Sequence, residues 1–188
     1  MDSPPEDLAH DSTGYGKVEL RRWRTSDDEL CSHLVRESLE HLHPWMPWVT
    51  ASYELADAQD YLERCEDDWA AGTAFQYLIL ADGAPAGSAG LMARIAPGGL
   101  EIGYWVHPAA TCRGVATAAS AALTEAALAL PGIDHVEIHH DQLNFASGRV
   151  PEKLGYTHVD TRDGRFEPAP GDSGTILVWR ITRQPASS

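Results

Sequence analysis

Cysteines are few in this chain and lie far apart. Cys31, Cys65 and Cys112 are the three cysteines among 188 residues, an odd number with no C-x-x-C spacing. Such a set does not form a disulfide framework. We therefore expect a protein of a reducing compartment, the cytoplasm.

Long apolar runs are also missing. No stretch comes near the roughly 18 consecutive apolar residues that a membrane-spanning helix needs. The first residues, MDSPPEDLAHDSTGYG, are acidic and lack the apolar centre of a signal peptide. The sequence therefore predicts no membrane partner.

Positive charge is scarce as well. Lys and Arg total 14 against 28 Asp and Glu, which gives a formal net charge of −14 at pH 7. Nucleic-acid backbones are bound by basic surfaces, so this composition argues against a nucleic-acid partner. It favours a cationic partner instead. The glycine motifs of P-loop and dinucleotide-binding proteins do not occur either.

Apolar periodicity, prolines and turn residues predict a mixed α/β domain. Strands are expected at 17–24, 75–81, 87–95, 100–107, 135–140, 156–161 and 175–182, and helices at 26–40, 54–71, 114–130 and 145–154. A run of hairpins followed by β-α-β units indicates a mixed sheet with helices on its faces. We expect a flexible segment at 1–16, one domain over 17–183 and a flexible end at 184–188.

The segment 100–117, LEIGYWVHPAATCRGVAT, carries the strongest functional signal. A strand ends before Pro108, and a long helix begins near Gly114. Small side chains at Gly114 and Ala116 allow an anion to approach the backbone N–H groups at this positively polarised helix end. Arg113 adds a charged donor. The pattern predicts a site for a diphosphate, although a strand–loop–helix unit with a convenient glycine is the structural alternative.

Two motifs within this segment and one beyond it extend this signal. EIGYWVHP at 101–108, RGVAT at 113–117 and N-x-x-S…EKLGY at 144–156 together resemble the GNAT superfamily of N-acetyltransferases. HLHPWMPW at 41–48 resembles the Trp-rich loop of its RimJ/RimL branch, which acetylates ribosomal-protein N-termini. The likeness covers about residues 17–182. It implies a mostly antiparallel sheet with helices on both faces, in which two parallel strands splay apart to form the coenzyme A cleft.

The resemblance also implies the donor and the residues that bind it. The donor would be acetyl-CoA, with a longer acyl-CoA as an alternative. The residues expected to contact it are Trp105, Val106, Arg113, Gly114, Val115, Ala116, Thr117 and Asn144. Ser147 would lie near the thioester sulfur and protonate the departing thiolate. The chain departs from the family pattern at Thr111, where Gln or Arg is usual, and at Pro151, inside the last helix.

An amine acceptor must lose a proton before it attacks the thioester, because primary amines are largely protonated at pH 7. Glu101, on the strand beside the expected cleft, is our candidate proton acceptor. A surface carboxylate at Glu101 and a helix-capping role for Ser147 are the structural alternatives. His135, Glu137 and His139 alternate along one strand, but without a spaced further ligand we expect no metal.

The acceptor is predicted less closely. His43, Trp45 and Trp48 are candidate acceptor contacts, with core packing as the alternative for the two tryptophans. The acidic composition favours a cationic amine, such as a basic peptide N-terminus, a polyamine or an aminoglycoside. A non-catalytic acyl-CoA sensor is the alternative function, and only the resemblance indicates a homodimer.

Overall fold

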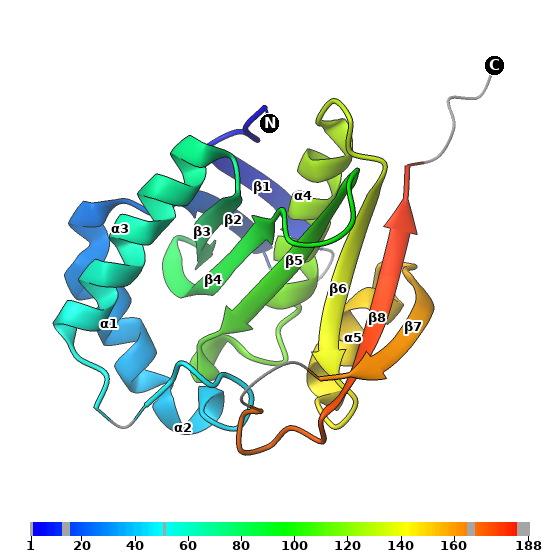
Figure 1. The fold of residues 1–188 in the computed structure, drawn as a ribbon. Coiled ribbons are helices and arrows are strands. Elements are labelled where there is room, and N and C mark those ends of the chain that lie inside the picture. Colours follow the sequence, from blue (N-terminus) through cyan, green and yellow to red (C-terminus); the bar gives the residue numbers. More distant parts are fainter. Residues whose placement is uncertain (1, 13–15, 51, 165–167, 184–188) are drawn as a thin grey trace.

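The computed structural model describes residues 2–12, 16–50, 52–164 and 168–183. The flexible end expected at 184–188 lies outside these ranges. In the described residues, eight strands form one sheet in the order β1-β2-β3-β4-β5-β6-β8-β7 (Figure 1). The strands are β1 Asp7–Ser12, β2 Gly16–Arg22, β3 Ala74–Ala81, β4 Ala84–Met92, β5 Gly99–Val106, β6 His135–Asp141, β7 Thr157–Asp163 and β8 Thr175–Thr182.

Every neighbouring pair in this sheet is antiparallel except β5 and β6. The mixed, mostly antiparallel sheet that the sequence predicts is therefore confirmed. The turn Asp82-Gly83 joins β3 to β4, and both residues have positive φ, 51° and 79°. Such a turn suits the twist of a hairpin.

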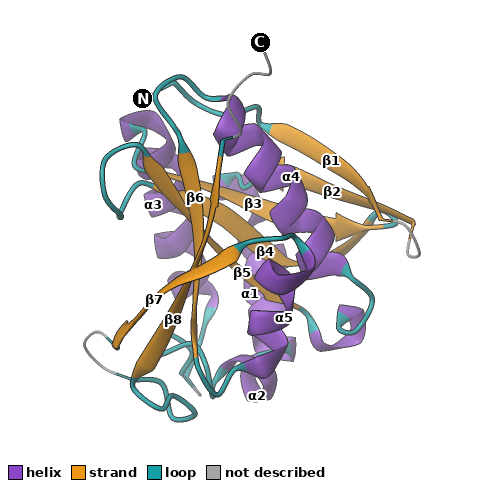
Figure 2. Cartoon of the chain, turned by 90° about the vertical axis from the view of Figure 1, so that its right-hand side faces the viewer, coloured by secondary structure: helices purple, strands orange, loops and turns teal. Residues whose placement is uncertain are grey.

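Helices cover both faces of the sheet (Figures 1 and 2). The helices are η1 Thr25–Asp27, α1 Asp28–Glu37, α2 Leu39–Leu42, α3 Leu55–Ala71, η2 Pro108–Ala110, α4 Val115–Ala129 and α5 Phe145–Lys153. α1 and α3 pack on one face, over β3 and β4, whereas α4 crosses the other face and α5 packs beside it. No helix among the described segments is long and apolar enough to cross a bilayer.

α4 shows how composition sets this architecture. Its sequence, VATAASAALTEAALA, is rich in the strongest helix former, and its small side chains let the helix lie close to the sheet. Ala119, Leu123 and Ala127 are fully buried there, against a core that includes Leu100 and Ile138. A helix that is apolar on nearly every side must be covered on several sides. The burial of α4 therefore fixes its N-terminus against the end of β5.

The N-terminal segment departs from the expectation of a flexible lead over 1–16. Residues 7–12 form β1, an edge strand paired with β2 from Asp7↔Arg21 onward. The carboxylate of Glu6 accepts hydrogen bonds from Arg22 at 2.7 Å and Arg24 at 2.5 Å. Charge pairing helps to hold this strand. Its sequence has no alternating apolar pattern, which is the signal that predicts a strand.

Candidate active site

The parallel strands β5 and β6 separate halfway along their length. Their pairing runs from Gly99↔His135 to Ile102↔Ile138 and then stops. Beyond that point β5 stays paired with β4 as far as Val106, and β6 stays paired with β8. Trp105 lies with Val106 on the diverging part of β5. Among the described residues, no strand pairs there with the edge of β5 that faces β6, so an extended ligand can bond to this edge.

The turn after β5 leads directly into the N-terminus of α4. Cys112 and Gly114 both have positive φ, 58° and 75°. Arg113 lies between them and is exposed. The first hydrogen bond of α4 runs from Ala118 N to Gly114 O at 2.9 Å, so the N–H groups of residues 115–117 have no partner within the helix. These three N–H groups, of Val115, Ala116 and Thr117, are available to an anion such as a diphosphate, and Arg113 adds a positive charge beside them.

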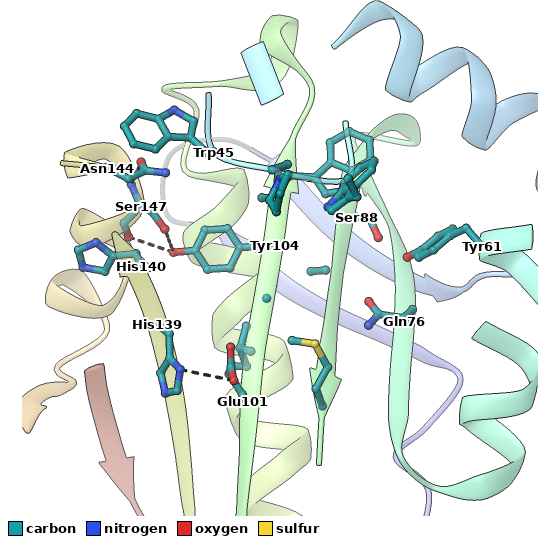
Figure 3. A pocket seen from close by; sticks show the side chains of 18 of the residues that line it. Trp45, Tyr61, Gln76, Ser88, Glu101, Tyr104, His139, His140, Asn144 and Ser147 are labelled. Atoms are coloured by element: carbon teal, nitrogen blue, oxygen red, sulfur yellow. Dashed lines mark hydrogen bonds and ion pairs between the residues drawn. The ribbon is translucent and has the colours of Figure 1, made fainter. Parts of the chain in front are cut away.

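Asn144 and Ser147 lie at the start of α5, close to the diverging part of β5 (Figure 3). Asn144 Oδ1 accepts a hydrogen bond from Ser147 N at 3.1 Å, so Asn144 caps this helix. This is a structural role for Asn144. No acceptor among the described residues is bonded to its amide nitrogen.

Tyr104 is a site residue that the sequence analysis did not single out. Its hydroxyl donates to the carbonyl of Ser147 at 2.9 Å and lies 3.0 Å from Ser147 Oγ. Within α5 that carbonyl would ordinarily accept from the residue four positions later, but this is Pro151, which has no N–H. Burial raises the pKa of Tyr104 to about 12, so its hydroxyl stays protonated near neutral pH.

A cavity of about 890 Å³ opens on the sheet face that carries α1 and α3. Trp45 and Trp48 line it, from the segment 41–50 that we call the Trp loop. His43 does not line it: its Nδ1–H donates to the carbonyl of Val49 at 3.1 Å and so ties the Trp loop together. Of the three predicted acceptor residues, the structure brings the two tryptophans to the cavity and leaves His43 out.

Glu101 lies on the floor of this cavity and is nearly buried, with 6% exposure. Its carboxylate accepts two hydrogen bonds from Arg94, at 2.9 and 2.6 Å. His139 of β6 lies beside it, with Nδ1 3.5 Å from Glu101 Oε2 (Figure 3). The predicted proton acceptor is therefore held in a charged network and is not a solvated surface carboxylate.

Glu137 is the second buried carboxylate of this network. Burial opposes its charged form, yet hydrogen bonds from His139 and Arg180 outweigh burial and hold the pKa of Glu137 below its ordinary value. His135, by contrast, contacts Asp134. The described residues contain no group of three or more His, Cys, Asp or Glu side chains placed to hold a metal ion.

The chain belongs to the acetyltransferase (GNAT) domain family, since the model of that family matches residues 17–157. It is thus a GNAT-family acetyltransferase. No curated protein sequence matches the chain.

Solved structures with the same fold include RimL and RimJ. RimL, a ribosomal alpha-N-protein acetyltransferase in complex with coenzyme A, has a TM-score of 0.82 at 20% identity, covering 93% of this chain and 97% of its own. RimJ of Mycobacterium smegmatis, in complex with CoA-disulfide, has a TM-score of 0.82 at 22% identity, and the match covers 96% of this chain and 90% of the RimJ chain.

A third structure shares the fold but is named for a different role. MccE, a microcin self-immunity acetyltransferase in complex with acetyl-CoA and AMP, has a TM-score of 0.81 at 17% identity, covering 92% of this chain and 94% of its own. The likeness of all three is one of fold. Since their names differ in role, the fold leaves the acceptor open.

Proposed function

We propose that this protein transfers the acetyl group of acetyl-CoA directly to a primary amine within a ternary complex. The observation that carries the proposal is the divergence of β5 from β6. A turn suited to an anion lies at one end of the diverging part, near Gly114, and a cavity with Glu101 on its floor opens on the sheet face of α1 and α3. A donor and an acceptor can therefore meet where the strands part, without a covalent enzyme intermediate.

The donor would bind mainly through the backbone. N–H groups over residues 113–117 would hold the diphosphate, with Arg113 adding charge. The backbone at Trp105 and Val106 would bond to the pantetheine arm, and the amide nitrogen of Asn144 would donate to it. Bound acetyl-CoA supplies a thioester whose carbonyl the Val106 N–H can polarise.

Proton transfers would use side chains on both sides of the reacting carbonyl. Glu101, directly or through water, would draw a proton from the acceptor amine. The hydroxyl of Ser147 would then protonate the departing thiolate. Because Tyr104 donates its one hydroxyl hydrogen to the carbonyl of Ser147, its oxygen can only accept from the Ser147 hydroxyl, 3.0 Å away. The Ser147 hydrogen would therefore turn from Tyr104 to the sulfur when the thiolate forms.

The acceptor would be a cationic amine that enters past the Trp loop. Trp45 and Trp48 supply apolar and cation–π contacts at the cavity wall. Acidic side chains line the same cavity: Asp57, Asp60, Asp163 and Asp172. The name of RimL, an alpha-N-protein acetyltransferase, makes a peptide N-terminus the first acceptor to test.

A free-thiol assay with acetyl-CoA tests the proposal across basic peptides, polyamines and aminoglycosides. With at least one amine we expect release of coenzyme A, detected as free thiol. That amine should gain 42 Da by mass spectrometry, the mass of an acetyl group replacing hydrogen, with about one acetyl transferred per thiol released. Glu101→Gln should keep coenzyme A binding and lose about tenfold or more in transfer rate. If wild-type protein binds coenzyme A and acetylates no amine, the proposal is wrong.

The anion-binding turn has its own prediction. Gly114→Glu should abolish coenzyme A binding, measured by calorimetry, because it places a carboxylate beside the diphosphate. Gly132→Glu is the matched control, since Gly132 lies just beyond the other end of α4 with a similar φ of 78°, against 75° at Gly114. Both variants place a side chain at a positive φ, where it is strained. Equal affinity in the two variants would contradict the assigned donor site.

A further inference from the structure

Two buried carboxylates face each other across β5 and β6 on the cavity side. Glu101 and Glu137 are register partners in the parallel pair, and their side chains are only 8% and 3% exposed. Like charges so close and so poorly solvated repel each other unless cations lie beside them. Arg94 pairs with Glu101, and Arg180 donates to Glu137 through Nε at 2.9 Å and through Nη2.

His139 bridges the two carboxylates. Its Nε2 lies 2.6 Å from Glu137 Oε2, and its Nδ1 lies 3.5 Å from Glu101 Oε2. Neighbouring groups fix which nitrogen carries hydrogen. Because the pKa of Glu137 is held low, that carboxylate can only accept, so Nε2 must donate to it. Arg162 Nη2 lies 3.4 Å from Nε2, but a guanidinium can only donate, so with the hydrogen on Nε2 this contact is not a hydrogen bond.

The nitrogen that gains or loses a proton is therefore Nδ1, which faces Glu101. Both oxygens of Glu101 already accept from Arg94, whereas unprotonated Nδ1 of His139 has a lone pair to take a proton. The 3.5 Å distance from Nδ1 to Oε2 is longer than an ordinary hydrogen bond, so no hydrogen is shared between these two atoms. One proton can therefore be added between them. This arrangement of an oriented imidazole backed by a carboxylate is typical of a general base.

We infer that His139 holds the proton that Glu101 draws from the acceptor amine, which makes it a proton-relay residue positioned by Glu137. The inference rests on the proposed function and adds a residue to it. The ammonium of the acceptor loses one proton through Glu101 or a bridging water, and Nδ1 gains it. The amine nitrogen then has its lone pair for the thioester carbonyl.

The relay also closes the proton balance. Once the C–N bond has formed, the amine nitrogen loses a second proton as the C–S bond breaks, and the thiolate takes up one proton to become a thiol. His139 then releases its own proton to solvent, since its side chain is 14% exposed and lines the cavity. The charged groups that surround the imidazole are Glu101, Glu137, Arg94, Arg162 and Arg180.

The tautomer gives a test that does not need catalysis. Histidine side chains labelled with ¹⁵N report which ring nitrogen carries hydrogen, and at pH 8.5 we expect His139 to be protonated at Nε2. In Glu137→Gln this preference should weaken, because an amide no longer demands a donor. A neutral His139 protonated at Nδ1 in the wild type would overturn the relay.

The pH profile of transfer to a peptide N-terminal amine gives the second test. At pH 7, His139→Gln should reduce kcat/KM by about tenfold or more. At pH 9.5, where the free amine predominates without help, the loss should shrink to about threefold or less. His33→Gln, an exposed histidine on α1 with a 67% exposed side chain, should match the wild type at both pH values.

The outcomes separate this inference from the proposed function. A loss in His139→Gln by the same factor at both pH values would indicate a structural role only, and would overturn the relay while leaving acetyl transfer intact. If the wild type acetylates no amine at either pH, the proposed function fails and the relay fails with it.

Discussion

At the scale of single residues, the hydroxyl of Tyr104 replaces a hydrogen bond that Pro151 removes from α5. A proline seven residues into α5 removes the N–H that would bond to the carbonyl of Ser147. The hydroxyl of Tyr104, 43 positions earlier in the chain and on β5, supplies the missing donor at 2.9 Å. The break in the helix therefore fastens α5 to the diverging strand at the place where the thiolate is expected to leave.

This pairing predicts the outcome of a double-mutant cycle. Tyr104→Phe leaves the Ser147 carbonyl without a donor and should lower the free energy of unfolding by about 1–3 kcal/mol. Pro151→Ala restores an N–H in the helix, so it should recover part of that loss in the Tyr104→Phe background. Urea unfolding of the four proteins measures both effects. Additive effects of the two substitutions would contradict the shared carbonyl.

Single residues also show which parts of the site the sequence can predict. The segment 100–117 predicted the turn at Gly114 because its signal is local: a strand, a proline, small residues and a helix. Tyr104 and His139 carry no such signal, since their partners Ser147 and Glu101 lie 43 and 38 positions away and meet them only through the sheet. His43 is the opposite case. It is close in sequence to two tryptophans that line the cavity, but its own side chain bonds to the carbonyl of Val49 instead.

At the scale of elements, the strands with apolar patterns and the long helices were predictable to within a few residues. α3 was expected at 54–71 and spans Leu55–Ala71, and α4 was expected at 114–130 and spans Val115–Ala129. β1 was missed because charge pairs and backbone bonds hold it. The helix expected at 26–40 is divided into η1, α1 and α2, and the carboxylate of Asp27 accepts from Arg24 N at 2.9 Å to close its first turn.

Loop placement also depends on one buried side chain that joins elements. The carboxylate of Asp141, at the end of β6, accepts from the backbone N–H groups of Leu143 and Ser173 at 2.8 Å each and from that of Gly174 at 3.2 Å. The loop before β8 is also bonded to the Trp loop, where Gly171 N donates to Pro44 O at 2.8 Å. Asp141 therefore helps to fix one wall of the cavity.

Asp141→Asn should loosen this wall. An amide offers one oxygen where two accept, and its NH₂ group faces N–H donors, so the free energy of unfolding should fall by about 1–3 kcal/mol. Amide hydrogen exchange over 169–175 should accelerate, and the KM for the acceptor should rise. Asp160→Asn, on β7 with a 55% exposed side chain, is the control. Unchanged exchange over 169–175 would show that the Asp141 contacts do not hold the loop.

At the scale of the whole molecule, the charge of −14 would favour the approach of a cationic acceptor. A cationic acceptor is attracted over distances of about one Debye length, roughly 10 Å at 0.1 M salt. The acids that line the cavity would direct this attraction toward the reacting centre. They are Asp57 and Asp60 on α3, Asp163 at the end of β7 and Asp172 in the loop before β8. A basic acceptor should therefore gain in association rate, whereas the chemical step after binding should not.

Salt dependence separates these two stages. With acetyl-CoA saturating, kcat/KM for a lysine-rich peptide should fall by about three- to tenfold between 50 and 500 mM NaCl, because salt screens the attraction between unlike charges. The kcat should change little, since the groups that move protons lie in a partly buried network that salt screens weakly. A peptide with the same N-terminal residue and no lysine should lose much less. Equal salt effects on the two peptides would mean that the acidic surface has no part in acceptor capture and that acceptor choice depends on the contacts of the Trp loop.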